Sequence, residues 1–222
     1  MQKLWRRCQI ICPYAVFVNS GKIMDDTILS ISHIEKSTTL LGPYRRYVLW
    51  VYGCYFDCEG CMAYNTKFGV EKLMTLQELV DDILQSDVEG ITISGGEPFL
   101  QADALYELVN KLKAQKDQGV IVYSGFTLEE LDNPLLSVID ILIDGRYVKE
   151  LDVGQAYIGS SNQKLHYLTD RYKNVAYYSD RQRKAEIKLT ADQAVLIGVP
   201  SSNVLNIWHD IKKRTGGDIS EF

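Results

Sequence analysis

The chain has 222 residues, of which 46% are hydrophobic and 24% charged, an ordinary globular composition with enough length for one sizeable core. Its net charge of −5 and the lack of a dominant basic block argue against nucleic-acid binding through phosphate contacts. No apolar run reaches about 18 residues, so we expect no membrane span. The short N-terminal apolar run is interrupted by Pro13 and lacks a small-residue cleavage site, so we expect no export.

Residues 1–26 show no clear pattern, and we interpret them as an N-terminal extension or a first strand. Cys8 and Cys12 lie in this segment without a third cysteine nearby. Two such residues are more often ordinary thiols than metal ligands, so we assign them no role.

From about residue 45 onward the sequence alternates between strand and helix patterns. Runs rich in β-branched and aromatic residues, each ending at or near a glycine, predict strands. These predicted strands cover residues 45–54, 89–96, 119–125 and 138–147.

Two amphipathic helices are predicted between these strands. Thr75 and Glu78 form a capping box that opens a helix running to about Ser86, and residues 100–115 form the second helix. A further capping box of Thr127 and Glu130 predicts a short helix.

Continuous apolar strands that alternate with helices predict a parallel sheet covered by helices. In such sheets the chemistry lies at the carboxyl ends of the strands. Each predicted strand here ends in a polar or glycine-bearing element, and we expect the four to meet on one face: GCYFDCEGC, SGGEP, YSG and DGR.

The alternation stops after about residue 165. Residues 184–200 predict a β-hairpin, and residues 201–214 predict a helix with a serine cap, followed by a polar tail. We therefore divide the chain into an extension (1–26), a core (27–170) and a C-terminal extension (171–222).

Three of the five cysteines are crowded into one short loop. Cys54, Cys58 and Cys61 follow a C-x3-C-x2-C spacing. A structural zinc site normally takes four ligands and disulfides take pairs, whereas a four-iron cluster held by three thiolates keeps one iron open for another ligand. This crowding indicates a metal centre in a reducing compartment, and we expect a cytoplasmic protein; a zinc knuckle or free thiols are the alternatives.

The cysteine loop, together with Gly95, Gly96 and Glu97 of ISGGEP after the next strand, resembles the signature of the radical S-adenosylmethionine (SAM) superfamily. The resemblance implies an α/β fold, an incomplete TIM-type radical SAM barrel with parallel strands, here with a small C-terminal hairpin and helix. It also implies a [4Fe-4S] cluster whose open iron binds the amino and carboxylate groups of SAM. The GGE turn would hold the amino group, because glycines allow close backbone approach and a carboxylate suits an ammonium.

Further segments narrow the resemblance to the anaerobic ribonucleotide reductase activating enzymes. They are IEKSTTLLGPYRRYVLWVYGC, CEGC, SGGEPFLQ, VYSGFTLEEL, IDILIDGRYV and YIGSSNQKL, within residues 27 to about 170. Gly60 before the third cysteine, where many superfamily members carry an aromatic residue, is usual in these activases. Residues 1–26 have no clear match, and the stretch after 170 is longer than in the smallest activases.

The resemblance also suggests further residues that contact SAM. Ser124 would touch its carboxylate or ribose, or else serve as a turn hydroxyl. Asp144 and Arg146 would form a polar pair near SAM, with Arg146 on the methionine carboxylate, or else a surface salt bridge. Asn162, in the segment 160–163, would lie near the adenosyl end or the cavity mouth, unless this is an ordinary polar loop.

Aromatic and sulfur side chains of the cysteine loop complete the expected site. Tyr55 and Phe56 would shield the cluster or pack in the core, and Met62 and Tyr64 would line an adenine pocket. Structural roles are expected for the three histidines: His33, His166 and His209.

The implied activity is reductive cleavage of SAM with an electron from a flavodoxin-type donor, followed by hydrogen abstraction from a glycine of a partner glycyl radical enzyme. The expected partner is an anaerobic ribonucleotide reductase-like protein. Alternatives are a 7-carboxy-7-deazaguanine synthase-like or peptide-modifying radical SAM enzyme. From a different class, a non-catalytic iron–sulfur or zinc binding module remains open. The C-terminal extension could dock a partner or close the fold.

Overall fold

The computed structural model describes residues 27–152, 154, 157–176, 183–189, 194–215 and 219–221. Residues 1–26, with Cys8 and Cys12, lie outside these ranges, so what the sequence predicts for them stays a prediction. Within the described residues, no helix combines the length and the apolar character needed to cross a membrane.

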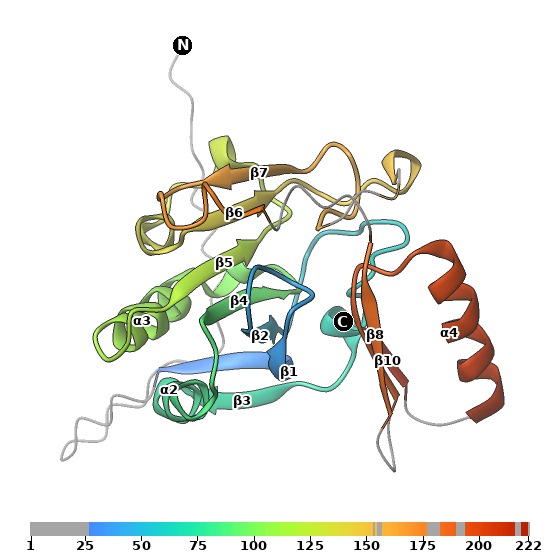
Figure 1. Ribbon diagram of the computed structural model, residues 1–222, viewed down its shortest axis with the longest axis horizontal. Helices are drawn as coiled ribbons and strands as arrows, with labels where there is room; N and C mark the ends of the chain where they lie inside the picture. The colour runs from blue at the N-terminus through green and yellow to red at the C-terminus, as the bar shows by residue number, and fades with distance from the viewer. Residues whose placement is uncertain are drawn as a thin grey trace.

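The core is a seven-stranded sheet with the strand order β3-β1-β2-β4-β5-β6-β7 (Figure 1). Strands β2, β4, β5 and β6 are parallel, whereas β1 pairs antiparallel with β2 and β3, and β7 pairs antiparallel with β6. The bounds are Ile28–Thr38 for β1, Arg46–Val51 for β2, Lys72–Thr75 for β3, Gly90–Gly95 for β4, Gly119–Tyr123 for β5, Ile141–Asp144 for β6 and Lys164–Tyr167 for β7.

Two helices cover one face of this sheet, α2 (Leu76–Gln85) and α3 (Ala102–Lys113). The predicted capping box of α2 is confirmed, because Glu78 N donates to Thr75 Oγ1 over 3.2 Å and Thr75 N donates to the Glu78 carboxylate over 2.8 Å. The remaining helical segments are short: α1 (Asn65–Phe68), η1 (Pro98–Gln101), η2 (Leu128–Glu130), η3 (Pro134–Val138) and η4 (Lys149–Leu151).

The alternation of side chains along β2 separates the two faces of the sheet. Tyr47, Leu49 and Val51 pack with α2 and α3 in the main hydrophobic cluster, whereas Val48 and Trp50 point to the opposite face. All six residues of β2 are buried, which explains why its sequence reads as a continuous apolar run.

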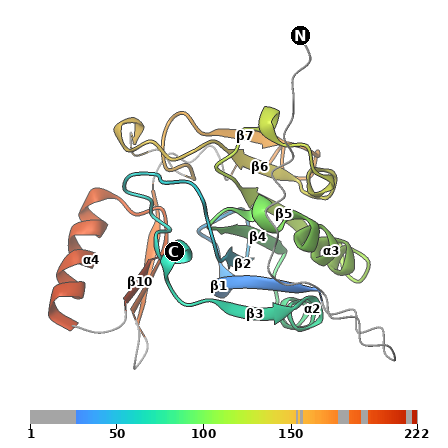
Figure 2. The same ribbon diagram turned by 180° about the vertical axis from the view of Figure 1, so that it is seen from behind.

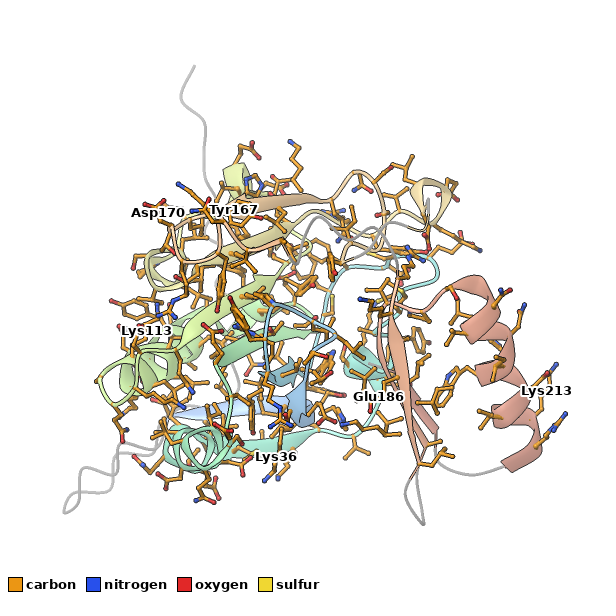
Figure 3. All side chains as sticks on the ribbon, in the orientation of Figure 1. Lys36, Lys113, Tyr167, Asp170, Glu186 and Lys213 are labelled. Atoms are coloured by element: carbon orange, nitrogen blue, oxygen red, sulfur yellow. The ribbon has the colours of Figure 1, made fainter. Side chains whose placement is uncertain are left out.

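The C-terminal part forms a separate small unit, which we call the C-terminal unit. It contains β8 (Ala185–Leu189), β9 (Ala194–Gly198), α4 (Ser202–Thr215) and β10 (Ile219–Glu221), with strand order β10-β9-β8. The predicted hairpin is confirmed by the antiparallel pairing of β8 with β9. Helix α4 lies on the side of this sheet that faces away from the core (Figure 2), and Figure 3 shows Lys213 on its outer surface.

The four predicted core strands and both predicted amphipathic helices are confirmed within a few residues at each end. Four strands were not individually predicted: β1, β3, β7 and β10. They are antiparallel or edge strands, or very short, so they lack the continuous apolar run of a central parallel strand; β1 also carries two register shifts that interrupt its alternation. The second capping box forms as predicted but closes only the 3₁₀ turn η2.

Candidate functional site

Two glycines bring the end of β4 against the start of the cysteine loop. Gly95 has a φ of +112°, and a Cβ atom on Gly96 would lie 1.9 Å from the carbonyl oxygen of Gly53. This close approach allows Gly96 N to donate to Val51 O and Glu97 N to donate to Gly53 O, both over 2.9 Å. Only glycine fits at these positions, so the sequence fixes the contact between the two loops.

The three loop cysteines are free thiols and line one open cavity together with Gly95, Gly96 and Glu97. Burial raises the pKa values of the Cys54 and Cys61 thiols. A metal that binds the thiolates would supply the positive charge that offsets this effect.

Three thiols can serve as ligands of a single metal ion or of an iron–sulfur cluster. Among the residues that the structure describes, no three His, Cys, Asp or Glu side chains are grouped closely enough to hold one metal ion. Ligands of one zinc ion lie about 3.8 Å from each other, as a zinc–sulfur bond of about 2.3 Å requires, whereas a four-iron cluster spreads its thiolates over different irons. The chemistry of the three thiols therefore fits a [4Fe-4S] cluster, and Gly95, Gly96 and Glu97 line the same cavity.

Glu97 joins the carboxyl ends of β4 and β5 at the wall of this cavity. Its fully buried carboxylate accepts hydrogen bonds from Ser124 Oγ (2.9 Å), Phe99 N (3.0 Å) and Gly125 N (2.7 Å). Burial raises the pKa of Glu97, although these hydrogen bonds oppose the shift. A carboxylate offers about four acceptor positions, so one position remains for a ligand ammonium.

Ser124 and Arg146, for which the sequence predicts contacts with SAM, also line the cavity. Besides donating to Glu97, Ser124 Oγ accepts from Phe126 N over 3.0 Å, so it also acts as a turn hydroxyl. The guanidinium carbon of Arg146 lies 4.4 Å from the ring centre of Phe56, and its side chain is exposed. Stacking on the ring holds this cation at the cavity without neutralising it.

Asp144 and Asn162, which the sequence also predicts near SAM, are not among the described residues that line the cavity. The buried carboxylate of Asp144 accepts from Leu128 N over 2.6 Å and lies 2.9 Å from His166 Nε2. Asn162 is exposed and donates to Arg146 O over 2.8 Å, so it supports the backbone of a residue at the cavity. Its neighbour Gln163 lines the cavity instead and bridges Gly159 N and Gly145 O, both over 2.7 Å.

The aromatic and sulfur residues of the cysteine loop are arranged largely as expected. Phe56, Met62 and Tyr64 line the cavity, and Phe56 is 8% exposed. Tyr55 is exposed, with its ring centre 4.4 Å from that of Phe56. His33 packs against Trp50, with ring centres 5.4 Å apart, and so has the structural role expected of it.

Several cavity residues were not predicted from the sequence. Lys67 Nζ donates to Phe56 O over 2.9 Å and lies 3.3 Å from the Asp57 carboxylate, which ties the cysteine loop to α1. Tyr157 lines the cavity with a φ of +65°, a conformation that non-glycine residues seldom adopt. A lone lysine or tyrosine carries no spacing signal, so only the fold could identify these two residues.

Comparison with known proteins agrees with this geometry. Residues 40–166 match the family model of the 4Fe-4S single cluster domain, which spans the cysteine loop, the strands from β2 to β6 and most of β7. The residues of the C-terminal unit lie beyond the matched range.

Individual relatives are activating proteins. The chain is 32% identical over 137 residues to the anaerobic ribonucleoside-triphosphate reductase-activating protein of Enterobacteria phage T4, covering 58% of this chain and 88% of that protein. It is 34% identical over 142 residues to the protein of the same name from Vibrio cholerae, covering 58% and 91%. The pyruvate formate-lyase-activating enzyme of Listeria monocytogenes is 29% identical over 134 residues, covering 54% of each chain. The chain therefore belongs to the 4Fe-4S single cluster domain family and, within it, to the radical SAM activating enzymes represented by the anaerobic ribonucleoside-triphosphate reductase-activating proteins.

Proposed function

We propose that this protein binds SAM at a [4Fe-4S] cluster held by Cys54, Cys58 and Cys61, cleaves it reductively, and uses the product to generate a glycyl radical on a partner enzyme. One observation carries the proposal: the three thiols and the Gly95–Gly96–Glu97 turn face the same cavity. The cluster and SAM supply the difficult chemistry, in which one electron splits the sulfonium into methionine and a 5′-deoxyadenosyl radical that can abstract a hydrogen atom.

The residues of this chain would bind and orient the small molecule. The remaining acceptor position of Glu97 would take the ammonium of the methionine moiety, and the backbone around Gly96 allows close approach. Arg146, held over Phe56, would face the methionine carboxylate. Ser124 would act through Glu97, which it holds in place.

The partner that fits best is an anaerobic ribonucleotide reductase-like enzyme. The relatives named for that reductase reach 34% identity and are covered to 88–91% of their length, whereas the pyruvate formate-lyase-activating enzyme is covered to 54%. A flavodoxin-type protein would supply the electron in the cytoplasm. The predicted domain division stays a proposal, and so does the description of the main sheet as an incomplete radical SAM barrel.

The first test measures 5′-deoxyadenosine. The full-length protein is reconstituted anaerobically with iron and sulfide, mixed with SAM and dithionite, and the nucleoside is quantified by chromatography. We expect about four irons per chain and nucleoside formation that is lost in Cys54→Ala and Cys58→Ala. The double variant Cys8→Ala/Cys12→Ala is the matched control, because the sequence assigns these cysteines no role, and it should retain full activity.

Binding of one zinc instead of a cluster, or nucleoside formation that persists without Cys58, would rule the proposed chemistry out. The partner is tested separately by mixing the loaded protein with an anaerobic ribonucleotide reductase and recording its electron paramagnetic resonance spectrum. A glycyl radical signal that depends on SAM supports that partner. A signal obtained only with a pyruvate formate-lyase would reassign it.

A further inference from the structure

The C-terminal unit covers the side of the main sheet that α2 and α3 leave open. Alternate residues of β9 point in opposite directions: Val195 and Ile197 pack against Val48 and Trp50 of β2, whereas Ala194 and Leu196 pack against Trp208 of α4. The two-sided apolar pattern of β9 is thus explained by one contact to the core and one to its own helix.

This packing places the end of β9 at the candidate active site. Gly198 and Val199 line the same cavity as the three cysteines. These residues lie beyond residue 166, where the match to the 4Fe-4S single cluster domain ends, so this part of the cavity wall lies outside the matched domain.

Arg183 connects the C-terminal unit to the loops around the cavity. Its almost fully buried side chain forms a two-armed ion pair with Asp152, with Nη1 3.1 Å from Oδ2. It also donates to Gly159 O over 3.0 Å and to Pro200 O over 3.3 Å. One guanidinium therefore holds the segment after η4, the cavity loop at Gly159 and the residues that follow β9.

A second cavity lies between the C-terminal unit and the cysteine loop. It is lined by Arg183 and Asp152, by His209 of α4, and by Cys61 from the cysteine loop. Cys61 borders both of these cavities. Cys54 and Cys58 line the first cavity but are not among the residues that line the second. The ion pair thus lines a cavity that Cys61 also borders.

We propose that the C-terminal unit is a wall of the active-site cavity, and that Arg183 is the positioning residue that holds this wall against the segments at Asp152 and Gly159 and so limits access to Cys61. The contacts of Arg183 support this role. A two-armed ion pair together with two carbonyl acceptors holds the guanidinium of a buried arginine in one orientation. Any effect of this wall on catalysis rests on the proposed function, whereas the position of the C-terminal unit at the cavity does not.

The test uses site-resolved alkylation of the full-length, cluster-free protein under reducing conditions. N-ethylmaleimide is added in pulses, and mass spectrometry of the peptides gives a separate rate for each cysteine. In Arg183→Met we expect Cys61 to react several-fold faster than in the wild type, while the rate at Cys54 stays within the experimental error. Arg183→Lys, which keeps the charge but not the two-armed contact, should give an intermediate rate.

Asp152→Asn serves as a second variant because it weakens the same contact from the core side with little change in volume. It should reproduce the selective effect on Cys61, and it decides the question if Arg183→Met does not fold. Lys188→Met is the matched control: it removes an ion pair of 2.8 Å between Lys188 and Glu35, which joins the C-terminal unit to β1 outside both cavities. An unchanged rate at Cys61 in Asp152→Asn, or an equal increase in Lys188→Met, would overturn the proposal.

A further readout uses the protein reconstituted with iron and sulfide. The rate at which a chelator removes iron should rise several-fold in Arg183→Met and Asp152→Asn, and stay at the wild-type value in Lys188→Met. If the wild-type protein forms no cluster, the proposed function fails, whereas the alkylation pattern still tests the wall. The two proposals can therefore fail separately.

Discussion

At the scale of single residues, the site depends on a buried carboxylate with defined hydrogen-bond donors. Glu97 lies at 0% exposure and accepts from one hydroxyl and two backbone N–H groups that belong to the ends of β4 and β5. A buried carboxylate of this kind stabilises the fold only while it accepts these hydrogen bonds, because a buried donor without an acceptor destabilises the folded protein. The same side chain thus joins two strands at the wall of the cavity.

Replacing Glu97 by Gln tests both roles. One amide NH2 group would face a donor where the carboxylate now accepts, so we expect a loss of about 1–3 kcal/mol in the free energy of unfolding, measured by urea denaturation. SAM affinity of the reconstituted protein, measured by equilibrium binding, should also fall. Ser124→Ala is the control: it removes one donor and leaves two, so its loss of stability should be smaller. Equal stability of Glu97→Gln and wild type would contradict this account.

At the scale of elements, local sequence signals explain where α2 begins. Thr75 and Glu78 form both hydrogen bonds of a capping box ahead of a ten-residue helix. Thr127 and Glu130 form the same pair of bonds ahead of a three-residue 3₁₀ turn. The cap chemistry is the same in both, but only in the first does a buried helix depend on it.

Thr75→Ala and Thr127→Ala therefore form a matched pair. Thr75→Ala should cost about 1 kcal/mol, because N-cap N–H groups lose their acceptor and the helix packs in the core. For a chain of this size that corresponds to a fall in Tm of about 2–4 °C. Thr127→Ala should cost clearly less. The measurement is thermal unfolding by circular dichroism, and the reverse order of the two losses would show that the cap is not what stabilises α2.

Strand β1 contributes a pH-dependent part of the stability through His33. Burial lowers the pKa of His33 from its ordinary value of 6.5. At a pH between the lowered pKa of His33 in the folded protein and the pKa of 6.5 in the unfolded chain, the unfolded chain binds more protons. The stability that depends on neutral His33 is therefore present above pH 6.5 and is lost as the pH falls below this value. The slope from one such group is at most about 1.36 kcal/mol per pH unit.

Urea denaturation of the cluster-free protein between pH 5 and pH 8 measures this slope. His33→Gln should show a smaller loss of stability on acidification than the wild type, because glutamine does not titrate. His209→Gln, which changes an exposed histidine of α4, is the matched control and should follow the wild-type curve. Parallel curves for His33→Gln and wild type would mean that another group causes the acid sensitivity.

At the scale of the whole molecule, one buried arginine joins strands and segments that are distant in the sequence. Arg46 has no exposed surface, and it donates to Thr92 Oγ1 (3.2 Å), Glu89 Oε2 (2.5 Å), Tyr172 Oη (2.6 Å) and Gly119 O (3.0 Å). These partners belong to β4, β5 and the neighbouring loops, at the edge of the sheet opposite the cysteine loop. The arginine therefore fixes the amino ends of the strands whose carboxyl ends form the site.

Arg46→Met should destabilise the protein by about 1–3 kcal/mol, because it takes the donor away from the buried acceptors Thr92 Oγ1 and Gly119 O, whereas Glu89 keeps other donors. Lys36→Met is the control, since Lys36 forms a surface ion pair with Asp82 beside α2 (Figure 3) and its removal should cost at most about 1 kcal/mol. Urea denaturation gives both values. A loss in Arg46→Met no greater than in Lys36→Met would show that the network does not hold the sheet together.

The central strands, the two covering helices, the cysteine loop and the GGE turn could be predicted from the amino-acid sequence. These features depend on local causes: apolar periodicity, capping boxes, and glycines that permit a close approach at a turn. Because the carboxyl ends of parallel strands share one edge of a sheet, the convergence of Cys54, Glu97 and Ser124 at one cavity could also be predicted.

Which neighbouring polar residues reach the cavity depends on how the chain packs in three dimensions. Asp144 and Asn162 occupy segments that resemble the family pattern, yet hydrogen bonds to Leu128 N and Arg146 O direct them to supporting positions. Lys67 and Val199 line the cavity without any signal in their local sequence. Such residues are selected by contacts between segments far apart in the chain, and side-chain periodicity carries no information about those contacts.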